Sequence, residues 1–398
     1  MRESLLHNKT ILLGVTGSIA SYKAVDIASQ LVKEGANVTV AITEAATKFI
    51  TPFTFKTITG NVPFYDMWDI NAPSREMHIE LSHKADLMIV APATASTIAS
   101  IAYGLADDSV ALCALASKAP LLIAPAMDHQ MWSHSTTESN VNKMIEKNID
   151  IIGPEYGRLA SGELGLGRLA STMNIIGAAK HKLGKISGDL VGCRIIVTAG
   201  GTREPMDPVR YLGNRSSGKM GYAVAEAARD RGADVVLISS VERGAINGVQ
   251  LVNVETTQDM MDEVHKQVNS ADAIIMAAAV SDFKFNRVQS TKIKSKHKDI
   301  NIHLMPNPDI IASVGDGIVK VAFAAELENI IEHATEKLQN KKVDFVVAND
   351  VGSKESGFNS DNNQVTIIQK NGNIDKLPLL SKIDVGHEIL DRLINYFK

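Results

Sequence analysis

Two segments of this 398-residue chain repeat one pattern: an apolar run, a glycine-containing turn and the start of a helical pattern. The first is TILLGV (10–15), with Gly14 and Gly17 in the turn, and the second is the β-branched run Ile195-Ile196-Val197, followed by Gly200 and Gly201. A strand, a glycine turn and a helix N-terminus bring free backbone N–H groups to one point, where they bind anions. The repeat predicts an α/β fold of two Rossmann-like domains.

The length and a change in composition predict the domain boundary. A single hydrophobic core rarely grows to 398 residues, so two domains are expected. A helix-like run over 170–186 leads into the polar, glycine-bearing stretch ISGDLVG, after which the strand–turn–helix pattern restarts. We therefore predict domains at 1–187 and 188–398.

The second glycine turn is long and rich in groups that hold phosphate or carboxylate. Those groups are Arg203, Arg210, Asn214, Arg215 and Lys219, and the turn ends at Ser216-Ser217-Gly218 before a helical pattern. In open α/β sheets, ligands bind at the carboxyl ends of the strands, and this turn occupies such a position. A solvated loop is the alternative reading.

Charge and cysteine content limit the possible partners. The net charge of −4 argues against a nucleic-acid surface spread over the molecule. The two cysteines, Cys113 and Cys193, lie in apolar segments and exclude a disulfide framework, which fits a cytoplasmic protein. No signal peptide and no membrane span are expected, because no apolar run is long enough.

The first glycine turn favours a mononucleotide over NAD. It lacks the G-x-G-x-x-G pattern, and Thr43 stands after the second expected strand, where a dinucleotide site would place an acid. Ser18 is predicted to cap the following helix, which should run to about Glu34. The loops 91–94, 125–128 and 153–155 follow three further expected strands and should meet at the same edge.

A basic segment follows another expected strand in the second half. It runs from 283 to 299 and holds Lys284, Arg287, Lys292, Lys294, Lys296 and Lys298. Such runs are usually solvated loops or nucleic-acid patches. Its position directly after a strand also favours a clamp over a triphosphate.

Long motifs in a fixed order carry a resemblance to a known family. In the first half they are GSIASYK (17–23), TEAATKFITP (43–52), HIEL (78–81) and PAMDHQMW (125–132). In the second half they are TAGGTREP (198–205), NRSSGKMG (214–221), AAAVSDF (277–283), KIK (292–294), NPDI (307–310) and FAAE (323–326). The sequence resembles the bacterial bifunctional phosphopantothenoylcysteine decarboxylase/phosphopantothenate–cysteine ligases of coenzyme A synthesis.

For the first half, the resemblance implies a flavodoxin-like, homo-oligomeric FMN domain that decarboxylates the cysteine adduct to 4′-phosphopantetheine. Flavin would oxidise the cysteine unit so that CO₂ leaves, and would then return the hydride. The implied flavin-contacting residues are Gly17, Ser18, Thr43, Ala93 and Thr94, and His78 is the implied catalytic histidine. A lone histidine on a helix is more often a packing residue, and that alternative stays open.

For the second half, the resemblance implies a CTP-dependent ligase that joins 4′-phosphopantothenate to L-cysteine through an acyl-cytidylate. Lys292 matches the essential lysine, and Asn214 matches the residue that holds the intermediate. Mg²⁺ is expected with CTP, held mostly by phosphate oxygens, and the sequence does not assign its ligands. The implied CTP-binding residues are Asp282, Lys292, Asn307, Pro308, Asp309, Ile310, Phe323, Lys337 and Lys341.

Two positions depart from the family pattern, and both are in the first half. Asp128 stands where the family has asparagine, and Ser161 stands where it has a cysteine that helps to reduce the intermediate. These changes leave a second hypothesis, a ligase whose first domain binds FMN mainly for assembly. A third hypothesis is an NAD-linked oxidoreductase, which would lack both the glycine motif and the ribose acid.

Overall fold

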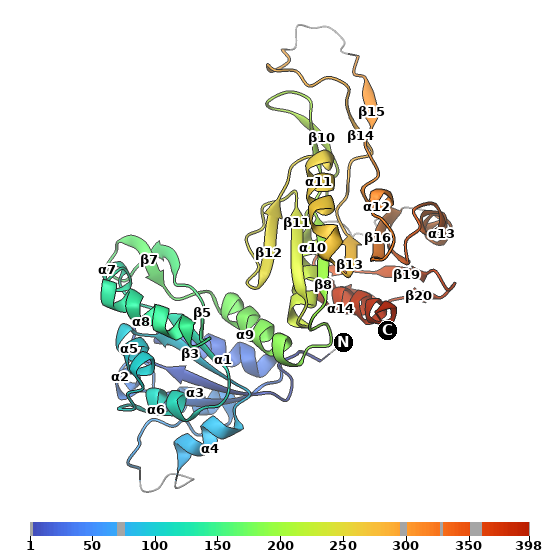
Figure 1. Ribbon diagram of the computed structural model, residues 1–398. Coiled ribbons are helices and arrows are strands. Elements are labelled where there is room, and N and C mark those ends of the chain that lie inside the picture. The colour runs from blue at the N-terminus through green and yellow to red at the C-terminus, as the bar shows by residue number, and fades with distance from the viewer. Residues whose placement is uncertain (1–2, 70–75, 295–300, 327–328, 351–359, 398) are drawn as a thin grey trace. The chain divides into compact units, whose positions relative to one another are not determined.

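The computed structural model describes residues 3–69, 76–294, 301–326, 329–350 and 360–397. Contacts divide the chain into two compact units (Figure 1), and the division along the sequence falls between Leu183 and Gly184. We call residues 3–183 the first unit and residues 184–397 the second unit. The predicted boundary at residue 187 is the last residue of a helix that begins in the first unit. None of the described helices is long and apolar enough to cross a membrane.

The first unit is built around a parallel sheet with the strand order β2-β1-β3-β4-β5. This is the flavodoxin-like order of doubly wound sheets. Its strands are β1 (Thr10–Val15), β2 (Asn37–Ile42), β3 (Leu87–Ala93), β4 (Leu121–Pro125) and β5 (Asp150–Ile151), with a hairpin of β6 (Glu155–Arg158) and β7 (Leu164–Arg168). Its helices are α1 (Ser21–Lys33), α2 (Glu44–Thr47), α3 (Pro52–Thr59), α4 (Met77–Lys84), α5 (Ala95–Tyr103), α6 (Ser109–Ala116), α7 (His129–Trp132), α8 (Ser135–Glu146) and α9 (Thr172–Ser187).

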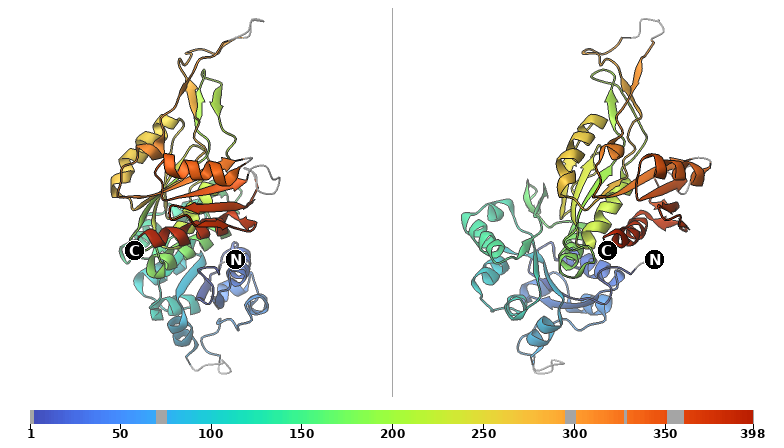
Figure 2. Two further views of the ribbon diagram at one scale, coloured as in Figure 1. Left: turned by 90° about the vertical axis from the view of Figure 1, so that its right-hand side faces the viewer. Right: turned by 45° about the vertical axis from the view of Figure 1, so that its right-hand side comes forward.

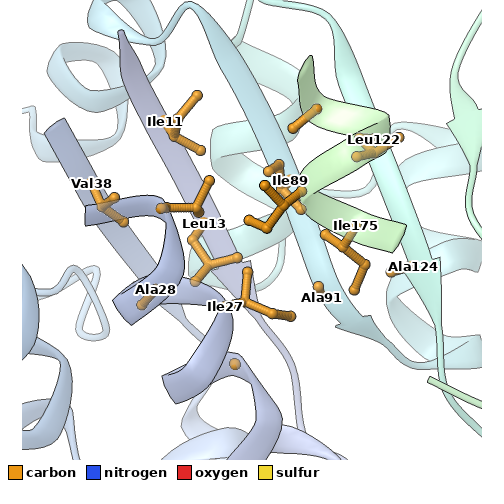
Figure 3. Packing of buried hydrophobic residues seen from close by; sticks show 14 of the residues in the cluster. Ile11, Leu13, Ile27, Ala28, Val38, Ile89, Ala91, Leu122, Ala124 and Ile175 are labelled. Atoms are coloured by element: carbon orange, nitrogen blue, oxygen red, sulfur yellow. The ribbon is translucent and has the colours of Figure 1, made fainter. Parts of the chain in front are cut away.

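Alternating side chains of the strands form two cores, one on each face of this sheet. Ile11 and Leu13 of β1 pack with Ile27 of α1 and Ile175 of α9 (Figure 3). Leu12, between them in the sequence, points to the other face and packs against α4, α5, α6 and α8. Burying each such side chain contributes about 1.5–3 kcal/mol, which holds the strand ends in place.

The second unit has a parallel sheet with an antiparallel edge, in the order β12-β11-β8-β13-β16-β17-β19-β20. Its first six strands have the dinucleotide-fold order, which reverses between β8 and β13. The sheet strands are β8 (Arg194–Ala199), β11 (Asp234–Ser239), β12 (Val249–Asn253), β13 (Ala273–Met276), β16 (Val319–Glu326), β17 (Phe345–Asp350), β19 (Val365–Gln369) and β20 (Ile374–Lys376). The other strands are β9 (Arg203–Pro205), β10 (Tyr211–Gly213), β14 (Phe283–Phe285), β15 (Leu304–Pro306), β18 (Asn362–Asn363) and β21 (Leu380–Ser381).

Helices cover both faces of the second sheet (Figure 2). α10 (Lys219–Asp230) and α14 (Lys382–Leu393) share one core with the sheet. α11 (Thr257–Gln267), α12 (Ile310–Ser313) and α13 (Ile330–Asn340) cover the other face, and two 3-10 turns lie at 268–270 and 394–396. β10, β14 and β15 extend beyond the sheet (Figure 1), and we call the segment 283–306 the arm.

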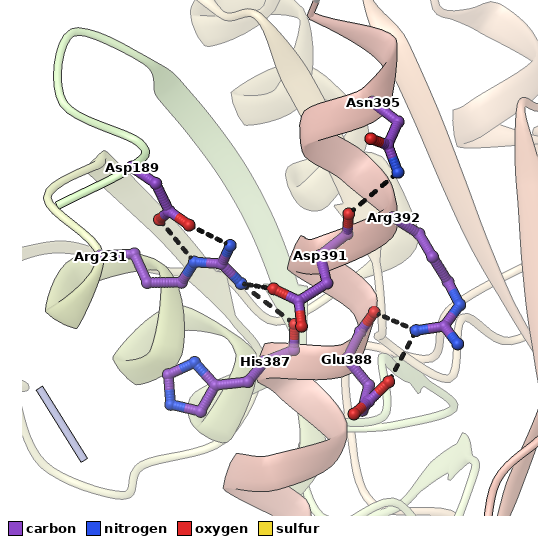
Figure 4. Close-up of polar contacts among 7 residues, drawn as sticks. All are labelled: Asp189, Arg231, His387, Glu388, Asp391, Arg392 and Asn395. Atoms are coloured by element: carbon purple, nitrogen blue, oxygen red, sulfur yellow. Dashed lines mark hydrogen bonds and ion pairs between the residues drawn. The ribbon is translucent and has the colours of Figure 1, made fainter. Parts of the chain in front are cut away.

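A buried arginine joins three segments of the second unit (Figure 4). Arg231 follows α10, and its guanidinium binds both carboxylate oxygens of Asp189 at 2.8 and 2.6 Å. It also reaches Asp391 of α14 at 2.7 Å and the carbonyl of His387 at 3.1 Å. Because the Arg231 side chain is 4% exposed, these partners replace the water that its charge loses on burial.

The sequence predicted several elements closely and misplaced one helix start. β1 has the predicted bounds, β8 contains the predicted run 195–197, and α1 ends at Lys33, one residue before the expected end. The predicted cap at Ser18 is wrong, because α1 begins at Ser21 after Ala20. The Ser18 hydroxyl instead accepts from the Ala20 N–H, and the Ser21 hydroxyl donates to the Thr16 carbonyl. Because of this turn, α1 begins after Ala20 and not after Ser18.

Candidate functional site

A cavity of about 840 Å³ lies at the carboxyl ends of β13, β16 and β17, next to the strand-order reversal between β8 and β13. This is the position at which open α/β sheets bind ligands. All the predicted CTP-binding residues except Lys292 line it, and so does the predicted intermediate-binding residue. They are Asn214, Asp282, Asn307, Pro308, Asp309, Ile310, Phe323, Lys337 and Lys341.

Two of the predicted lysines are fixed by the strands and turns beside them. Lys341 pairs with Asp309 at 3.1 Å between Nζ and Oδ2, and Lys337 donates to the Phe323 carbonyl at 2.6 Å. Asp309 also caps α12 by accepting from the Ala312 N–H. The cavity therefore contains cations that are already oriented, as binding of an anionic nucleotide requires.

A buried chain of hydrogen bonds fixes Asn307. Its Nδ2 donates to the Ser281 carbonyl at 2.9 Å and to Thr257 Oγ1 at 3.2 Å. Thr257 in turn donates its hydroxyl proton to the buried Glu204 carboxylate at 2.7 Å. Sequence reasoning missed Glu204 and Thr257 as supports of the site. Glu204 lies within a family motif, but nothing in the sequence pairs it with Thr257.

Asn214 lies at the start of the turn between β10 and α10, where hydrogen bonds fix its side chain. Its Nδ2 donates to the carbonyls of Ala279 and Val280 at 3.2 and 3.0 Å, which leaves its Oδ1 as an acceptor. Gly218 then starts α10 with a φ of 75°, a left-handed conformation that favours glycine. A Cβ at this residue would also lie 2.5 Å from the Val241 side chain.

Lys292 does not line the cavity. It is exposed on the arm, where its neighbour Ile293 donates its N–H to Asp207 Oδ2 at 3.2 Å. Arg210 links the same two residues by binding Asp207 Oδ2 and the Ile293 carbonyl, each at 2.6 Å. The structure thus does not bring Lys292 into the cavity that the other predicted CTP-binding residues line. Lys296 and Lys298 lie outside the described residues.

Asp207 holds Arg210 and the arm residue Ile293 together. Burial tends to raise the pKa of its carboxyl, but hydrogen bonds from the Val209 N–H and from Arg210 outweigh it and hold the pKa well below its usual range. The aspartate therefore stays ionised and paired at neutral pH.

The predicted flavin-contacting residues meet at the carboxyl edge of the first sheet. Ser18 follows β1, Thr43 follows β2, Ala93 ends β3 and Thr94 follows it. The Thr94 N–H donates to Thr16 Oγ1 at 3.1 Å, which ties the β1 and β3 turns together at the strand-order reversal. Gly17 is also in the β1 turn, where a Cβ would lie 2.5 Å from Ala45 Cβ.

The donor set at this edge fits a phosphate monoester. The hydroxyl oxygens of Ser18 and Thr43 accept from backbone N–H groups, so their protons point away from those groups and can be donated. α1 and α5 both begin here, and the N-termini of helices favour negative charge. The residues present therefore suit the phosphate end of a flavin mononucleotide.

The other predicted residues of the first unit lie on different elements. His78 is the second residue of α4 and is partly buried. Asp128 caps α7 by accepting from the Gln130 N–H at 3.0 Å. Ser161, at the tip of the β6–β7 hairpin, donates to the second oxygen of Asp128 at 3.0 Å. The two positions that depart from the family pattern are therefore bonded to each other, which the sequence did not indicate.

The described ranges hold no group of three or more His, Cys, Asp or Glu side chains that could bind a metal ion. Hard cations such as Mg²⁺ can instead be held mainly by substrate phosphates. A cavity lined by lysines suits a substrate whose phosphates would carry the metal ion.

Comparison with known proteins agrees with this two-part architecture. Residues 2–184 match the family model "Flavoprotein", and residues 190–396 match "DNA/pantothenate metabolism flavoprotein C-terminal domain". Among solved structures, the C-terminal domain of coenzyme A biosynthesis bifunctional protein CoaBC is 38% identical, covering 53% of this chain and 98% of that chain (TM-score 0.46). The FMN-dependent cysteine decarboxylase SpaF is 27% identical and covers 44% of this chain and 99% of its own (TM-score 0.38).

Two relatives match along almost their whole length. The coenzyme A biosynthesis bifunctional protein CoaBC of Bacillus subtilis is 40% identical over 395 residues, covering 98% of this chain and 97% of the relative. The CoaBC protein of Escherichia coli K12 is 39% identical over 401 residues, with 98% of each chain covered. The chain belongs to the family of coenzyme A biosynthesis bifunctional proteins.

Proposed function

We propose that this protein joins 4′-phosphopantothenate to L-cysteine with CTP and then decarboxylates the product to 4′-phosphopantetheine with FMN. Its family is that of bifunctional enzymes with ligase and decarboxylase activities. The observation that carries the assignment of substrates is the cavity of the second unit, which collects nearly all the predicted CTP-binding residues. Full-length family membership does not favour a first unit that serves assembly alone.

In the ligase step, the carboxylate of 4′-phosphopantothenate attacks the α-phosphorus of CTP and pyrophosphate leaves. The amine of cysteine then attacks the acyl carbon, CMP leaves, and the amine proton passes to solvent. The chain contributes positive charge from Lys337 and Lys341 and a fixed acceptor at Asn214 Oδ1. Such groups stabilise developing charge because they need no reorganisation during the reaction. Mg²⁺ would be bound through the phosphate oxygens of CTP.

We place FMN at the carboxyl edge of the first sheet, with its phosphate on the hydroxyls of Ser18 and Thr43. When bound, FMN accepts and returns the electron pair that makes loss of CO₂ possible. The chain's own part is to orient the substrate. His78 is the proposed catalytic group, and Asp128 faces the hairpin that holds Ser161.

We propose that the ligase cavity is completed by the arm of a second copy of the chain. The arm carries Lys292 outside the cavity of its own chain, although the reaction needs that charge near the phosphates. Apolar side chains on and beside the arm are exposed, as expected for a protein interface. They are Val209, Tyr211, Phe283, Val288, Ile302, Leu304 and Met305.

Two measurements on the purified full chain test this proposal. Mass spectrometry of the released cofactor should identify FMN, and FAD or NAD would contradict the first-unit assignment. Continuous pyrophosphate release should require 4′-phosphopantothenate, cysteine and CTP together, because without cysteine the acyl-cytidylate is not consumed and release stops after one turnover. UTP is the matched control nucleotide. Equal rates with UTP would contradict the assignment of CTP.

A further inference from the structure

The helices α10 and α14 both begin with a lysine, at Lys219 and Lys382. They pack side by side and run in the same direction, since Gly386 of α14 lies against Ala223 of α10 and, farther along both helices, Asp391 pairs with Arg231. Both lysines therefore sit at positive helix ends, where acidic residues are favoured and cations are not. Where a chain breaks a local rule twice at one place, a functional reason is expected.

Lys382 is buried although it is charged. Its residue is 8% exposed, and its Nζ donates to the Ser360 carbonyl. The charged groups that face it are Lys219 and Arg243, which repel it, and Asp361, which attracts it. Burial, followed by the Lys219 charge, lowers the pKa of Lys382 to about 8. Asp361 is already paired with Lys219 at 2.7 Å, and its side chain is 90% exposed.

Lys219 and Lys382 line the same cavity as the predicted CTP-binding residues. Asn363 lines it as well and is 1% exposed, and its Oδ1 has no hydrogen-bond partner in the described part of the chain. Lys337 and Lys341 reach the cavity from α13 on the other face of the sheet. The cavity thus has cations on both sides, and only those on the α13 side were predicted as CTP-binding residues.

We propose that Lys382, together with Lys219, binds a phosphate group of a ligase substrate at the shared start of α10 and α14. This inference rests on the proposed ligase function and adds a binding residue from the last helix. The phosphate belongs either to the polyphosphate tail of CTP or to the 4′-phosphate of phosphopantothenate. Charge-assisted hydrogen bonds at helix N-termini suit both sources.

The test is calorimetric binding of CTP with Mg²⁺, and separately of 4′-phosphopantothenate, to full-length Lys382→Met and Lys382→Arg variants. Removing one charge-assisted contact should weaken one of the two ligands by about ten-fold to a hundred-fold, and arginine should restore most of the affinity. The weakened ligand identifies the source of the phosphate. The matched control is Lys320→Met, because Lys320 is also buried and donates to a carbonyl, that of Val314 at 2.7 Å, but does not line the cavity.

The pH dependence provides a readout that a structural role would not produce. A bound phosphate favours the protonated lysine, so its affinity is full below the pKa of about 8 and falls as the pH rises through that value. Lys382→Arg should remove this fall, because arginine stays charged. The inference is overturned if Lys382→Met binds both ligands within about two-fold of the unsubstituted chain. Failure of the unsubstituted chain to bind CTP would instead contradict the proposed function.

Discussion

The two sheet edges of this protein organise their candidate sites differently. In the second unit, residues from β13, β16 and β17 and from the helices on both faces line one cavity. In the first unit, the turns that hold the predicted flavin-contacting residues meet at the strand-order reversal, but His78 lies on α4, Asp128 caps α7 and Ser161 lies on a hairpin. Strand order alone brings together the turns that follow the strands. Groups on peripheral elements need further contacts, and the Ser161–Asp128 bond is one of them.

The largest expected effect tests whether Lys292 and Asn214 belong to the ligase site. Lys292→Gln and Asn214→Asp should each slow pyrophosphate release by about a hundred-fold or more. The first removes a positive charge, and the second adds a negative charge beside the phosphates. Near-normal release by either variant would show that the site is wrongly assigned.

Mixing these two variants tests whether Lys292 acts on the cavity of its own chain or on that of a second copy. If the arm acts on the cavity of a second copy, a hybrid dimer contains one intact site, and random exchange at equal amounts should restore about a quarter of the sites. Pyrophosphate release after exchange measures this directly. A mixture as slow as its components would show that Lys292 acts within its own chain.

A smaller effect is expected when the buried ion pairs of Arg231 in the second unit are removed, and it concerns the free energy of unfolding. Arg231→Met leaves Asp189 and Asp391 without their buried partner and should lower the free energy of unfolding by about 2 kcal/mol. Urea unfolding of the full chain measures it. Lys185→Met is the matched control, because its ion pair with Asp234 is exposed and should contribute about 0.5 kcal/mol or less. Equal effects of the two substitutions would contradict a structural role for Arg231.

The smallest expected effect concerns the departures in the first unit. Two like charges about 4 Å apart repel by roughly 1–4 kcal/mol, so an ionised Asp128 near the substrate carboxylate should slow decarboxylation. Asp128→Asn keeps the cap of α7 and should raise the rate of CO₂ release by about ten-fold. Ser161→Cys should further increase the yield of reduced product. Turnover unimproved by either change would refute this account of the two departures.

Sequence reasoning succeeded where local pattern determines structure. The bounds of β1 and the place of β8 follow from continuous apolar runs. Asp309 and Phe323 line one cavity because the segments that hold them lie at one sheet edge. It failed where the outcome depends on contacts distant in sequence. Examples are the Glu204–Thr257–Asn307 chain of hydrogen bonds and the Ser161–Asp128 bond. Another is the position of Lys292 outside the cavity lining of its own chain. The Ser18 cap failed because an alternative turn competed for the same backbone N–H groups.

Measuring pyrophosphate and CO₂ in two parallel incubations tests the central claim, that a single chain performs both reactions. The full chain with 4′-phosphopantothenate, cysteine, CTP and Mg²⁺ should release pyrophosphate first and CO₂ afterwards, and both should stop when CTP is omitted. Supplying the ligated product in place of its precursors should release CO₂ without CTP. Release of pyrophosphate with no CO₂ in either incubation would contradict the account and would leave the first unit as an assembly domain.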